Sequence, residues 1–243
     1  METHSRDLEF RLMTIKLLNT VKKKHTYRDI SQWTGLPVTV LSRYVKGHVL
    51  PTSKRAKEIW ISLQKVADLE SALLSRIKFD STGYFDNTQI VNDISLLRLA
   101  TQHIISTFAG RRITKILTAA SDGIPLATLV ANALDVDLVV AKKTREVGVK
   151  DYIEESYVPP DSGVIVTFYI PKDVLRKGDS ILIVDDVIRT GETQEALINM
   201  VNKVKGEVRG IFILVAIGTD WKAKLNAPPN CLVDTLATIE KTV

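Results

Sequence analysis

The stretch from Ile181 to Thr193 constrains the fold of this chain more than any other segment. It opens with the aliphatic run Ile181–Val184, in which no polar residue alternates. Such a run is typical of a strand covered on both faces, as in the centre of a parallel α/β sheet. The run stops at Asp185 and Asp186, and a helix is predicted from about Gln194 to Val204. Ligands of open α/β sheets bind beyond the carboxyl ends of the strands, so we expect the two acids to border a ligand crevice.

The turn after the two acids has the composition of a phosphate site. Thr190 and Thr193 supply hydroxyls, and Gly191 allows an unusual φ. Backbone N–H groups at the start of a helix, with the helix dipole behind them, favour a phosphate dianion. Carboxylates suit hydroxyl groups or Mg²⁺. Together these groups indicate a phosphorylated sugar as the ligand.

The whole run resembles the PRPP-binding signature of type I phosphoribosyltransferases: an apolar strand, two acids, two apolar residues, and then a turn with Thr, Gly and Thr. The resemblance implies an α/β fold, a parallel sheet with helices on both faces. It also implies that the two acids hold the ribose hydroxyls, that the turn holds the 5′-phosphate, and that Mg²⁺ accompanies PRPP or pyrophosphate. The residues implied for ribose and 5′-phosphate are Asp185, Asp186, Arg189, Thr190, Gly191, Glu192 and Thr193.

Two residues depart from that signature. Arg189 stands where these enzymes usually carry Ala or an acid that assists the base, and Glu192 stands where a small residue is usual. A guanidinium adds a contact for phosphate, but it leaves no acid there to transfer a proton. We therefore expect ligand binding without catalysis and assign no catalytic residue. The alternative interpretation of the whole run is a buried strand that ends in a solvated acidic turn and binds no ligand.

A second unit repeats the pattern of strand, small-residue loop and helix. A strand is predicted over Ile113–Thr118 and a helix over Leu126–Leu134. The loop between them resembles the pyrophosphate loop of phosphoribosyltransferases. Cations follow the next predicted strand, Asp137–Ala141, and suit a pyrophosphate, although such clusters usually stay solvated. The residues implied for pyrophosphate are Ala120, Ser121, Asp122, Gly123, Lys142, Lys143 and Arg145.

The remainder of this region continues the α/β pattern. A helix is predicted over Asp93–Phe108, and residues 146–163, polar and without periodicity, resemble the mobile loop that closes over the ligand in these enzymes. Three aromatic residues are candidates for stacking on a base, with core packing as the alternative: Tyr84, Phe85 and Trp221. The further predicted strands are Val164–Ile170, Val208–Ile217 and Leu232–Ile239.

The positive charge of the chain is concentrated at one end. Residues 1–60 contain 12 Lys and Arg against 5 Asp and Glu, a net charge of +7, and the rest contains 21 against 23, a net charge of −2. This asymmetry favours a domain that contacts nucleic acid joined to a near-neutral one. No apolar run approaches the roughly 20 residues of a membrane span, and no leader segment is visible, so we expect a cytoplasmic protein without a membrane partner.

The basic segment has the outline of a helix-turn-helix. An amphipathic helix with Leu8 and Leu12 on its apolar face is predicted over residues 6–20, and a short one over Tyr27–Thr34 with Thr26 as its cap. Gly35 makes the turn, and Pro37 opens a helix that ends before Gly47. The end of this helix resembles the recognition helix of Cro/repressor-type domains. Its expected DNA-contacting residues are Thr39, Ser42, Arg43 and Lys46; a protein-contacting hairpin is the alternative.

A long helix with Ser53 as its cap is predicted from Lys54 to about Ile77. Its apolar residues recur at spacings of three and four, which is typical either of a dimer seam or of a helix that packs on its own domain. These residues are Ile59, Leu63, Val66, Leu73 and Ile77. Residues 78–88 read as the domain junction. The single Cys231 excludes an internal disulfide, and we expect it to be a packed thiol.

The expected organisation is a helix-turn-helix domain at 1–55, a linker helix and junction at 56–89, and a phosphoribosyltransferase-like domain at 90–243. This pairing resembles the archaeal helix-turn-helix, orotate-phosphoribosyltransferase-like regulators (the GfcR family) and, in domain arrangement, bacterial purine operon repressors. The resemblance implies a homodimeric transcription regulator that binds double-stranded promoter DNA and senses PRPP or a nucleotide. An active purine or pyrimidine phosphoribosyltransferase and an RNA-binding regulator are the alternatives.

Overall fold

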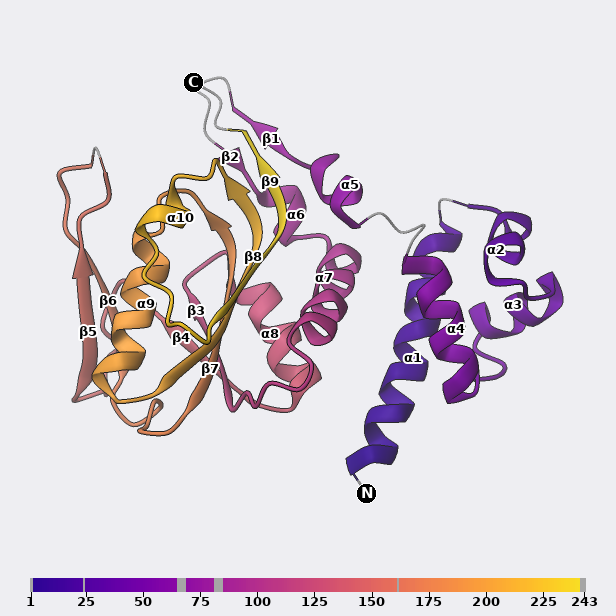
Figure 1. Ribbon diagram of the computed structural model, residues 1–243, viewed down its shortest axis with the longest axis horizontal. Coiled ribbons are helices and arrows are strands. Elements are labelled where there is room, and N and C mark those ends of the chain that lie inside the picture. The colour runs from indigo at the N-terminus through magenta and orange to yellow at the C-terminus, as the bar shows by residue number, and fades with distance from the viewer. Residues whose placement is uncertain (1, 24, 65–68, 81–84, 161, 241–243) are drawn as a thin grey trace. The chain divides into compact units, whose positions relative to one another are not determined.

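The structure, a computed structural model, describes residues 2–23, 25–64, 69–80, 85–160 and 162–240. The chain forms two compact units, Met1–Ala72 and Leu73–Val243, which we call the smaller and the larger unit (Figure 1). None of the helices in the described part of the chain combines the length and the hydropathy that a membrane span needs.

The smaller unit is built of helices around one apolar core. Leu18, Ile30, Leu41 and Leu63 lie at its centre, each at most 1% exposed. α1 and α4 pack on each other, and α2 and α3 pack beside them. The boundary between the two units, after Ala72, falls within α5. The helices are α1 (Glu2–Lys22), α2 (Tyr27–Thr34), α3 (Val38–Val45), α4 (Ser53–Gln64) and α5 (Leu69–Leu74).

The α2–turn–α3 segment forms as its capping residues predict. Thr26 and Asp29 make a reciprocal capping box at the start of α2. Gly35 ends the helix with a φ of +67°, a left-handed conformation that glycine adopts without a steric cost. Pro37 stands at the N-cap of α3, one residue earlier than predicted.

The predicted linker helix differs from the structure at its two ends, and Ile59 and Leu63 follow the predicted alternative of a helix that packs on its own domain. Its cap is Thr52, whose hydroxyl accepts from the Arg55 N–H at 3.3 Å, because Ser53 already belongs to α4. Ile59 and Leu63 are buried in the smaller unit, where α4 packs on α1, so they are not free to contact a partner. The described parts of this segment are α4 and α5, and α5 ends at Leu74 instead of Ile77. Val66, another residue of that seam, lies outside the described residues.

The first turns of α1 differ from the predicted amphipathic pattern. Leu8 and Leu12 are 38% and 42% exposed, whereas Ile15 and Leu18 are buried. The apolar spacing therefore predicts the helix correctly. It does not predict which turns of the helix are buried in the smaller unit.

The larger unit is organised around a parallel sheet of five strands in the order β4-β3-β7-β8-β9, and β7 is the central strand. Residues Ile181–Val184 of β7 are fully buried, which confirms the strand covered on both faces. The predicted strands of the sheet are confirmed to within two residues. They are β3 (Lys115–Ala119), β4 (Asp137–Ala141), β7 (Ser180–Ile188), β8 (Glu207–Ile217) and β9 (Leu232–Ile239).

Helices cover both faces of this sheet. α7 (Ile94–Thr107) and α8 (Ile124–Leu134) lie on one face and α9 (Glu192–Lys203) on the other (Figure 1). Gly210 on β8 leaves room for Phe108 at the end of α7, since a Cβ there would lie 2.2 Å from the ring. The short elements are β1 (Lys78–Phe79), β2 (Phe85–Asp86), α6 (Thr88–Val91) and α10 (Trp221–Lys224).

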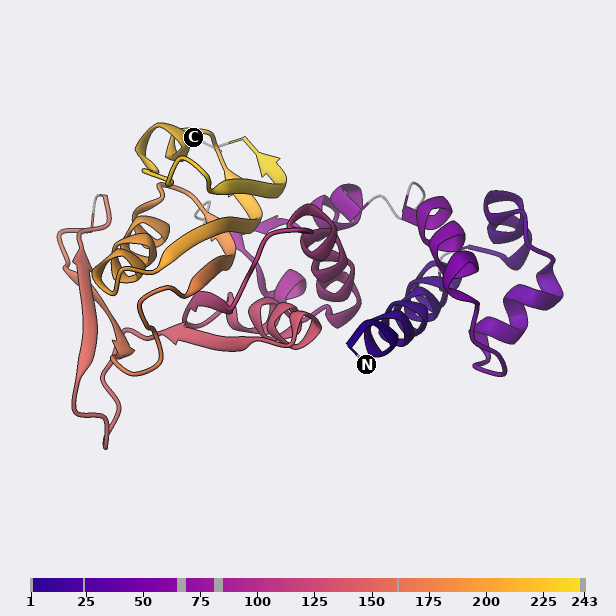
Figure 2. The same cartoon turned by 60° about the horizontal axis from the view of Figure 1, so that its bottom comes forward.

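A β-hairpin lies beside α9. Its second strand agrees with the predicted strand Val164–Ile170, whereas its first strand lies within residues 146–163, where an irregular loop was predicted. β5 (Tyr152–Tyr157) pairs antiparallel with β6 (Val166–Pro171), and both figures show it beside α9 (Figures 1 and 2). Glu154 and Glu155 broke the apolar alternation that would have indicated a strand. In the structure Arg145 pairs with the first and Lys203 with the second. The partners that keep these carboxylates in the strand come from outside it, so no local pattern reveals them.

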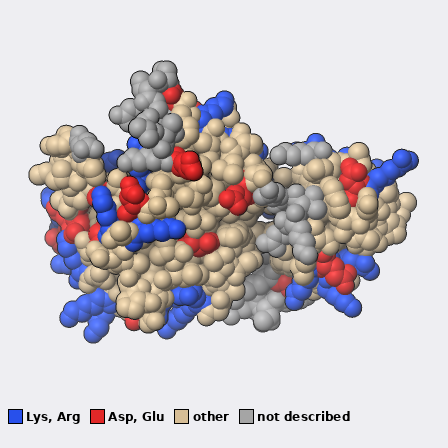
Figure 3. Space-filling model, turned by 45° about the horizontal axis from the view of Figure 1, so that its top comes forward, with Lys and Arg blue, Asp and Glu red and all other residues tan. Residues whose placement is uncertain are grey.

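On the face that Figure 3 shows, acidic and basic side chains are interspersed over the larger unit, in keeping with its near-zero net charge. The thiol of Cys231 is partly buried, and burial raises its pKa to about 11. Cys231 packs against the hydrophobic core, which confirms the prediction of a packed thiol. A raised pKa also makes a thiol a poorer nucleophile at neutral pH.

Asp93 fastens the start of α7, and its removal is expected to cost stability. One carboxylate oxygen accepts from the N–H groups of Ser95 and Leu96, and the other accepts from Arg76 at 2.6 Å. We expect Asp93→Ala to lower the free energy of unfolding by about 1 kcal/mol in urea denaturation. Asp93→Asn, which keeps an oxygen for the two amides, should lose less.

The contribution of Asp93 should also depend on pH. Burial alone would raise its pKa, but the hydrogen bonds from Leu96 and Arg76 outweigh burial and lower the pKa below the ordinary 3.8. Because the folded pKa is the lower one, this stabilisation is present above pH 3.8 and disappears as the pH falls further. A difference between wild type and Asp93→Ala that stayed constant down to acid pH would contradict this assignment.

Candidate functional site

Strand β7 delivers its first acid into the interior. Asp185 is 4% exposed; Gln194 of α9 donates to it at 2.8 Å, and the N–H of Asp186 donates at 3.2 Å. Its Oδ1 lies over Gly123, where a Cβ would be 2.5 Å from that oxygen and 2.3 Å from Oγ1 of Thr118. The predicted pyrophosphate loop therefore touches the acid pair, and only a glycine fits at this contact.

The second acid is partly exposed and is held by a residue that the sequence analysis assigned to the domain junction. Nδ2 of Asn87 donates to Asp186 at 2.5 Å and to Asp122 at 3.2 Å. Asn87 thereby ties the loop after β3 to the end of β7. Asn87 has this role because the fold brings the segment after β2 close to the two acids. No local sequence signal marks the residue.

The pKa of each of the two acids is raised in the folded chain. Burial raises the pKa of Asp185 well above its ordinary value, and the charge of Asp186 raises it further. Burial also raises the pKa of Asp186, in spite of the hydrogen bonds from its neighbours. Two adjacent carboxylates in a buried site cannot both ionise without cost, so a cation or hydroxyl donors at this edge would stabilise the ionised pair.

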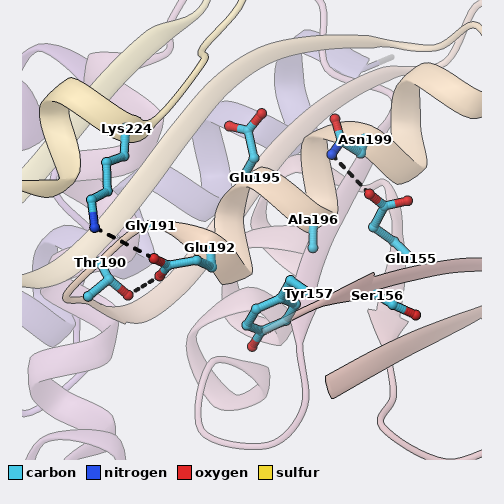
Figure 4. A pocket seen from close by; sticks show the side chains of 10 residues that line it. All are labelled: Glu155, Ser156, Tyr157, Thr190, Gly191, Glu192, Glu195, Ala196, Asn199 and Lys224. Carbon is cyan, nitrogen blue, oxygen red and sulfur yellow. Dashed lines mark hydrogen bonds and ion pairs between the residues drawn. The ribbon is translucent and has the colours of Figure 1, made fainter. Parts of the chain in front are cut away.

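The turn after β7 has the predicted helix-start geometry. Gly191 has a φ of +93° and caps α9, which begins at Glu192. Both predicted hydroxyls are engaged by side chains of the chain itself. The Thr190 hydroxyl donates to the Glu192 carboxylate (Figure 4). Oγ1 of Thr193 lies 2.9 Å from the Tyr157 hydroxyl.

Tyr157 lines two cavities. The first has a volume of about 230 Å³ and lies at the carboxyl ends of β3 and β7. It is lined by Ala119, Ala120, Ser121, Asp122, Lys143, Tyr157, Phe168, Asp185, Asp186, Val187 and Thr193. The second has a volume of about 270 Å³ and lies between β5 and the start of α9. It is lined by Glu155, Ser156, Tyr157, Thr190, Gly191, Glu192, Glu195, Ala196, Asn199 and Lys224 (Figure 4).

The structure brings most of the predicted ligand residues to these cavities and directs others elsewhere. Arg189 is exposed at the end of β7. Lys142 and Arg145 form ion pairs with Glu146 and Glu154, while Lys143 lines the first cavity. Arg145 also lies over the rings of Tyr152 and Tyr169.

The three aromatic candidates for base stacking have different positions. Trp221 is 3% exposed and packs in the core, which was the alternative for this residue. Phe85 is partly buried and packs edge-on against Phe79. Tyr84 lies outside the described residues.

Comparison with known proteins agrees with this geometry. The model of the phosphoribosyl transferase domain matches residues 85–241, which include the sheet, both loops and the hairpin. The chain belongs to this family. The crystal structure of adenine phosphoribosyltransferase from Rhodothermus marinus superposes with a TM-score of 0.63 at 29% identity, covering 71% of this chain and 99% of that one. The larger unit thus has the type I phosphoribosyltransferase fold.

Relatives within the family include regulators as well as enzymes. The purine biosynthesis transcriptional repressor PurR of Bacillus subtilis is 34% identical over 139 residues, 57% of this chain and 49% of the repressor. The xanthine phosphoribosyltransferase of Oceanobacillus iheyensis is 29% identical over 168 residues, 68% of this chain and 82% of the enzyme. The match thus spans about half the length of the repressor and most of the enzyme.

Proposed function

We propose that this chain is a DNA-binding transcription regulator in which a phosphoribosyltransferase-like domain senses PRPP or a nucleotide. One observation supports this proposal most strongly. The chain joins the acid pair and phosphate loop of the family fold to a separate helical unit with a net positive charge. The smaller unit, residues 1–72, contains 13 Lys and Arg against 7 Asp and Glu, a net charge of +6, whereas the larger unit has 20 against 21, a net charge of −1. The proposed domains are 1–55, 56–89 and 90–243, in an arrangement similar to the archaeal regulators named above.

In the proposed complex the ribose lies at the end of β7. Asp185 and Asp186 accept from its hydroxyls, and the backbone N–H groups from Thr190 to Thr193 hold the 5′-phosphate. The pyrophosphate of PRPP lies at Ala120–Gly123 with Lys143 beside it. This assignment is supported by the cavity at the carboxyl ends of the strands.

Mg²⁺ suits the oxygen groups around this cavity. Asp122 and Asp186 share the Asn87 amide as a donor, which places two carboxylates at one edge of the cavity. Mg²⁺ is commonly bound by one or two carboxylates together with the phosphates of a substrate. Bound with PRPP, the ion would supply positive charge to the pyrophosphate, while Asp122 and Asp186 orient it.

In the smaller unit, α2, the turn at Gly35 and α3 form the proposed helix-turn-helix, with α3 as the recognition helix. Thr39 and Arg43 on α3 and Lys46 at its C-cap are exposed, and Ser42 is half-buried, while Leu41 faces the core. An exposed Arg with hydroxyls and a Lys on one helix suits guanine and phosphate contacts in the major groove. We propose a homodimer that places two such helices on two half-sites.

Ligand and DNA would act on each other through linkage. A ligand that prefers one conformation of the dimer shifts the DNA equilibrium by its differential affinity for the two conformations. Arg189 at the usual place of an acid or Ala supports sensing over catalysis, because no acid stands there to transfer a proton.

Substitution of Arg43 tests the DNA-binding half of the proposal. Arg43→Ala should weaken binding to the specific promoter site by roughly 1–3 kcal/mol, if its guanidinium reads a guanine, and leave nonspecific binding nearly unchanged. Arg55→Ala is the matched control, because Arg55 is an exposed Arg of α4. Fluorescence anisotropy with operator and scrambled duplexes measures both. Equal losses for the two variants would contradict a recognition role of Arg43.

The second candidate is an active phosphoribosyltransferase with an accessory N-terminal unit. It is favoured by the match over 99% of the length of the R. marinus enzyme chain. A pyrophosphate-release assay with PRPP and adenine, guanine, hypoxanthine, xanthine, orotate and uracil separates the two. Turnover with any base would favour the enzyme, whereas PRPP binding without turnover would favour the sensor.

A further inference from the structure

A negatively charged side chain lies in the loop that the proposed function assigns to the ligand's phosphate. Glu192 is the first residue of α9, its side chain is 22% exposed, and its Oε2 accepts from the Thr190 hydroxyl. Both residues line the 270 Å³ cavity (Figure 4). A phosphate dianion needs donors, and here a carboxylate already occupies one of them.

A lysine approaches the same carboxylate from α10. Nζ of Lys224 lies 3.9 Å from Oε1 of Glu192, and the lysine side chain is 57% exposed (Figure 4). One oxygen of Glu192 thus faces a hydroxyl of the loop, and the other faces an exposed cation. The carboxylate can leave the hydroxyl without losing its charged partner.

We propose that Glu192 competes with the ligand's 5′-phosphate for the Thr190 hydroxyl, that Lys224 holds the displaced carboxylate, and that this pair thereby sets the affinity of the chain for a phosphorylated ribose. The inference rests on the proposed function of the same site and adds its affinity-determining residues. Glu192 acts on the ligand through the Thr190 hydroxyl and is therefore a positioning residue.

The repulsion between the two anions gives the expected size of the effect. A carboxylate and a phosphate near one hydroxyl are a few ångströms apart in a half-exposed cavity, so removing the carboxylate charge should strengthen binding roughly tenfold. Salt screens exposed charges, so the gain should shrink at high ionic strength. A glutamine at this position keeps the shape and an acceptor for Thr190, and therefore isolates the charge.

Calorimetric titration of the full chain with ribose 5-phosphate, repeated with PRPP and Mg²⁺, tests this. Glu192→Gln should bind roughly tenfold more tightly than wild type, and Lys224→Gln should bind more weakly, because the carboxylate then has no cation to receive it. Glu195→Gln is the matched control. Glu195 lines the same cavity but is held by the N–H of Asn226 at 2.9 Å, so its substitution should leave affinity within about twofold.

The outcomes separate the inference from the function on which it rests. Binding by wild type with equal or weaker binding by Glu192→Gln overturns the competition and leaves the sensor intact. Absence of binding by both chains overturns the proposed function itself. Glu192→Ala, which removes the carboxylate entirely, must shift affinity in the same direction as Glu192→Gln, and an opposite shift refutes the inference. Thermal melts establish that each variant is folded.

Discussion

Asp185→Asn is expected to melt at a higher temperature than wild type at neutral pH and to lose affinity for PRPP. The folded chain raises the pKa of Asp185 by burial and by the charge of Asp186, so ionisation of this carboxyl opposes folding. An asparagine fills the same space and carries no charge, and its one amide oxygen can keep one of the two bonds that the carboxylate accepts from Gln194 and from the Asp186 N–H. Each kcal/mol gained raises the melting temperature by roughly 2–4 °C in a chain of this size.

The pH dependence of this effect has a definite sign. Because the folded pKa of Asp185 is the higher one, the folded state binds more protons than the unfolded state above pH 3.8, and stability falls as the pH rises through that window. The advantage of Asp185→Asn should therefore be large at neutral pH and vanish near pH 3.8. Asp151→Asn, at an exposed carboxylate, is the control. Destabilisation by Asp185→Asn at neutral pH would show that the ionised acid supports the fold.

Gly123→Ala is expected to abolish PRPP binding and to lower the free energy of unfolding by roughly 1–3 kcal/mol. The new Cβ would lie 2.3 Å from Oγ1 of Thr118 and 2.5 Å from Oδ1 of Asp185, so the acid or the loop has to move. Either movement separates the proposed pyrophosphate loop from the acid pair. Calorimetry with PRPP and urea denaturation measure the two effects.

Gly206→Ala is the matched control for this substitution. Its Cβ would meet Val201 at 3.0 Å, away from both cavities, so it should lower stability modestly and leave PRPP binding unchanged. Thr118→Ala, combined with Gly123→Ala, removes one of the two collisions and should restore stability more than binding. Normal PRPP affinity in Gly123→Ala alone would contradict the contact between loop and acid pair as a requirement for binding.

Local sequence patterns predict the sheet and its helices because residues within each strand or helix determine where that element forms and ends. The aliphatic run Ile181–Val184 specifies a strand buried on both faces, and Thr26, Gly35 and Asp93 mark helix ends through their own capping bonds. The loop at Ala120–Gly123 and the turn at Thr190–Thr193 follow directly from such elements. The order of the strands then brings the two loops to one edge of the sheet.

The contacts that complete the site arise from packing between distant segments and escaped prediction. Asn87 reaches Asp186 across 99 positions of sequence, and Tyr157 reaches Thr193 across 36. Strand β5, which carries Tyr157, lies where the sequence predicts a loop, because the cations that pair with its glutamates come from outside the strand. Likewise Ile59 would be apolar whether it packed on α1 or on a partner chain, so the sequence does not decide between these two contacts. The structure does, because α4 packs on α1 and buries Ile59.

The proposed coupling between the two units is tested most directly by titrating PRPP and Mg²⁺ into the full chain with and without its promoter duplex, with Asp186→Ala as the control. The account predicts that DNA changes the affinity for PRPP, that PRPP changes the affinity for DNA by the same factor, and that Asp186→Ala binds DNA but shows neither change. An affinity for PRPP that is identical in the presence and absence of the duplex would contradict it.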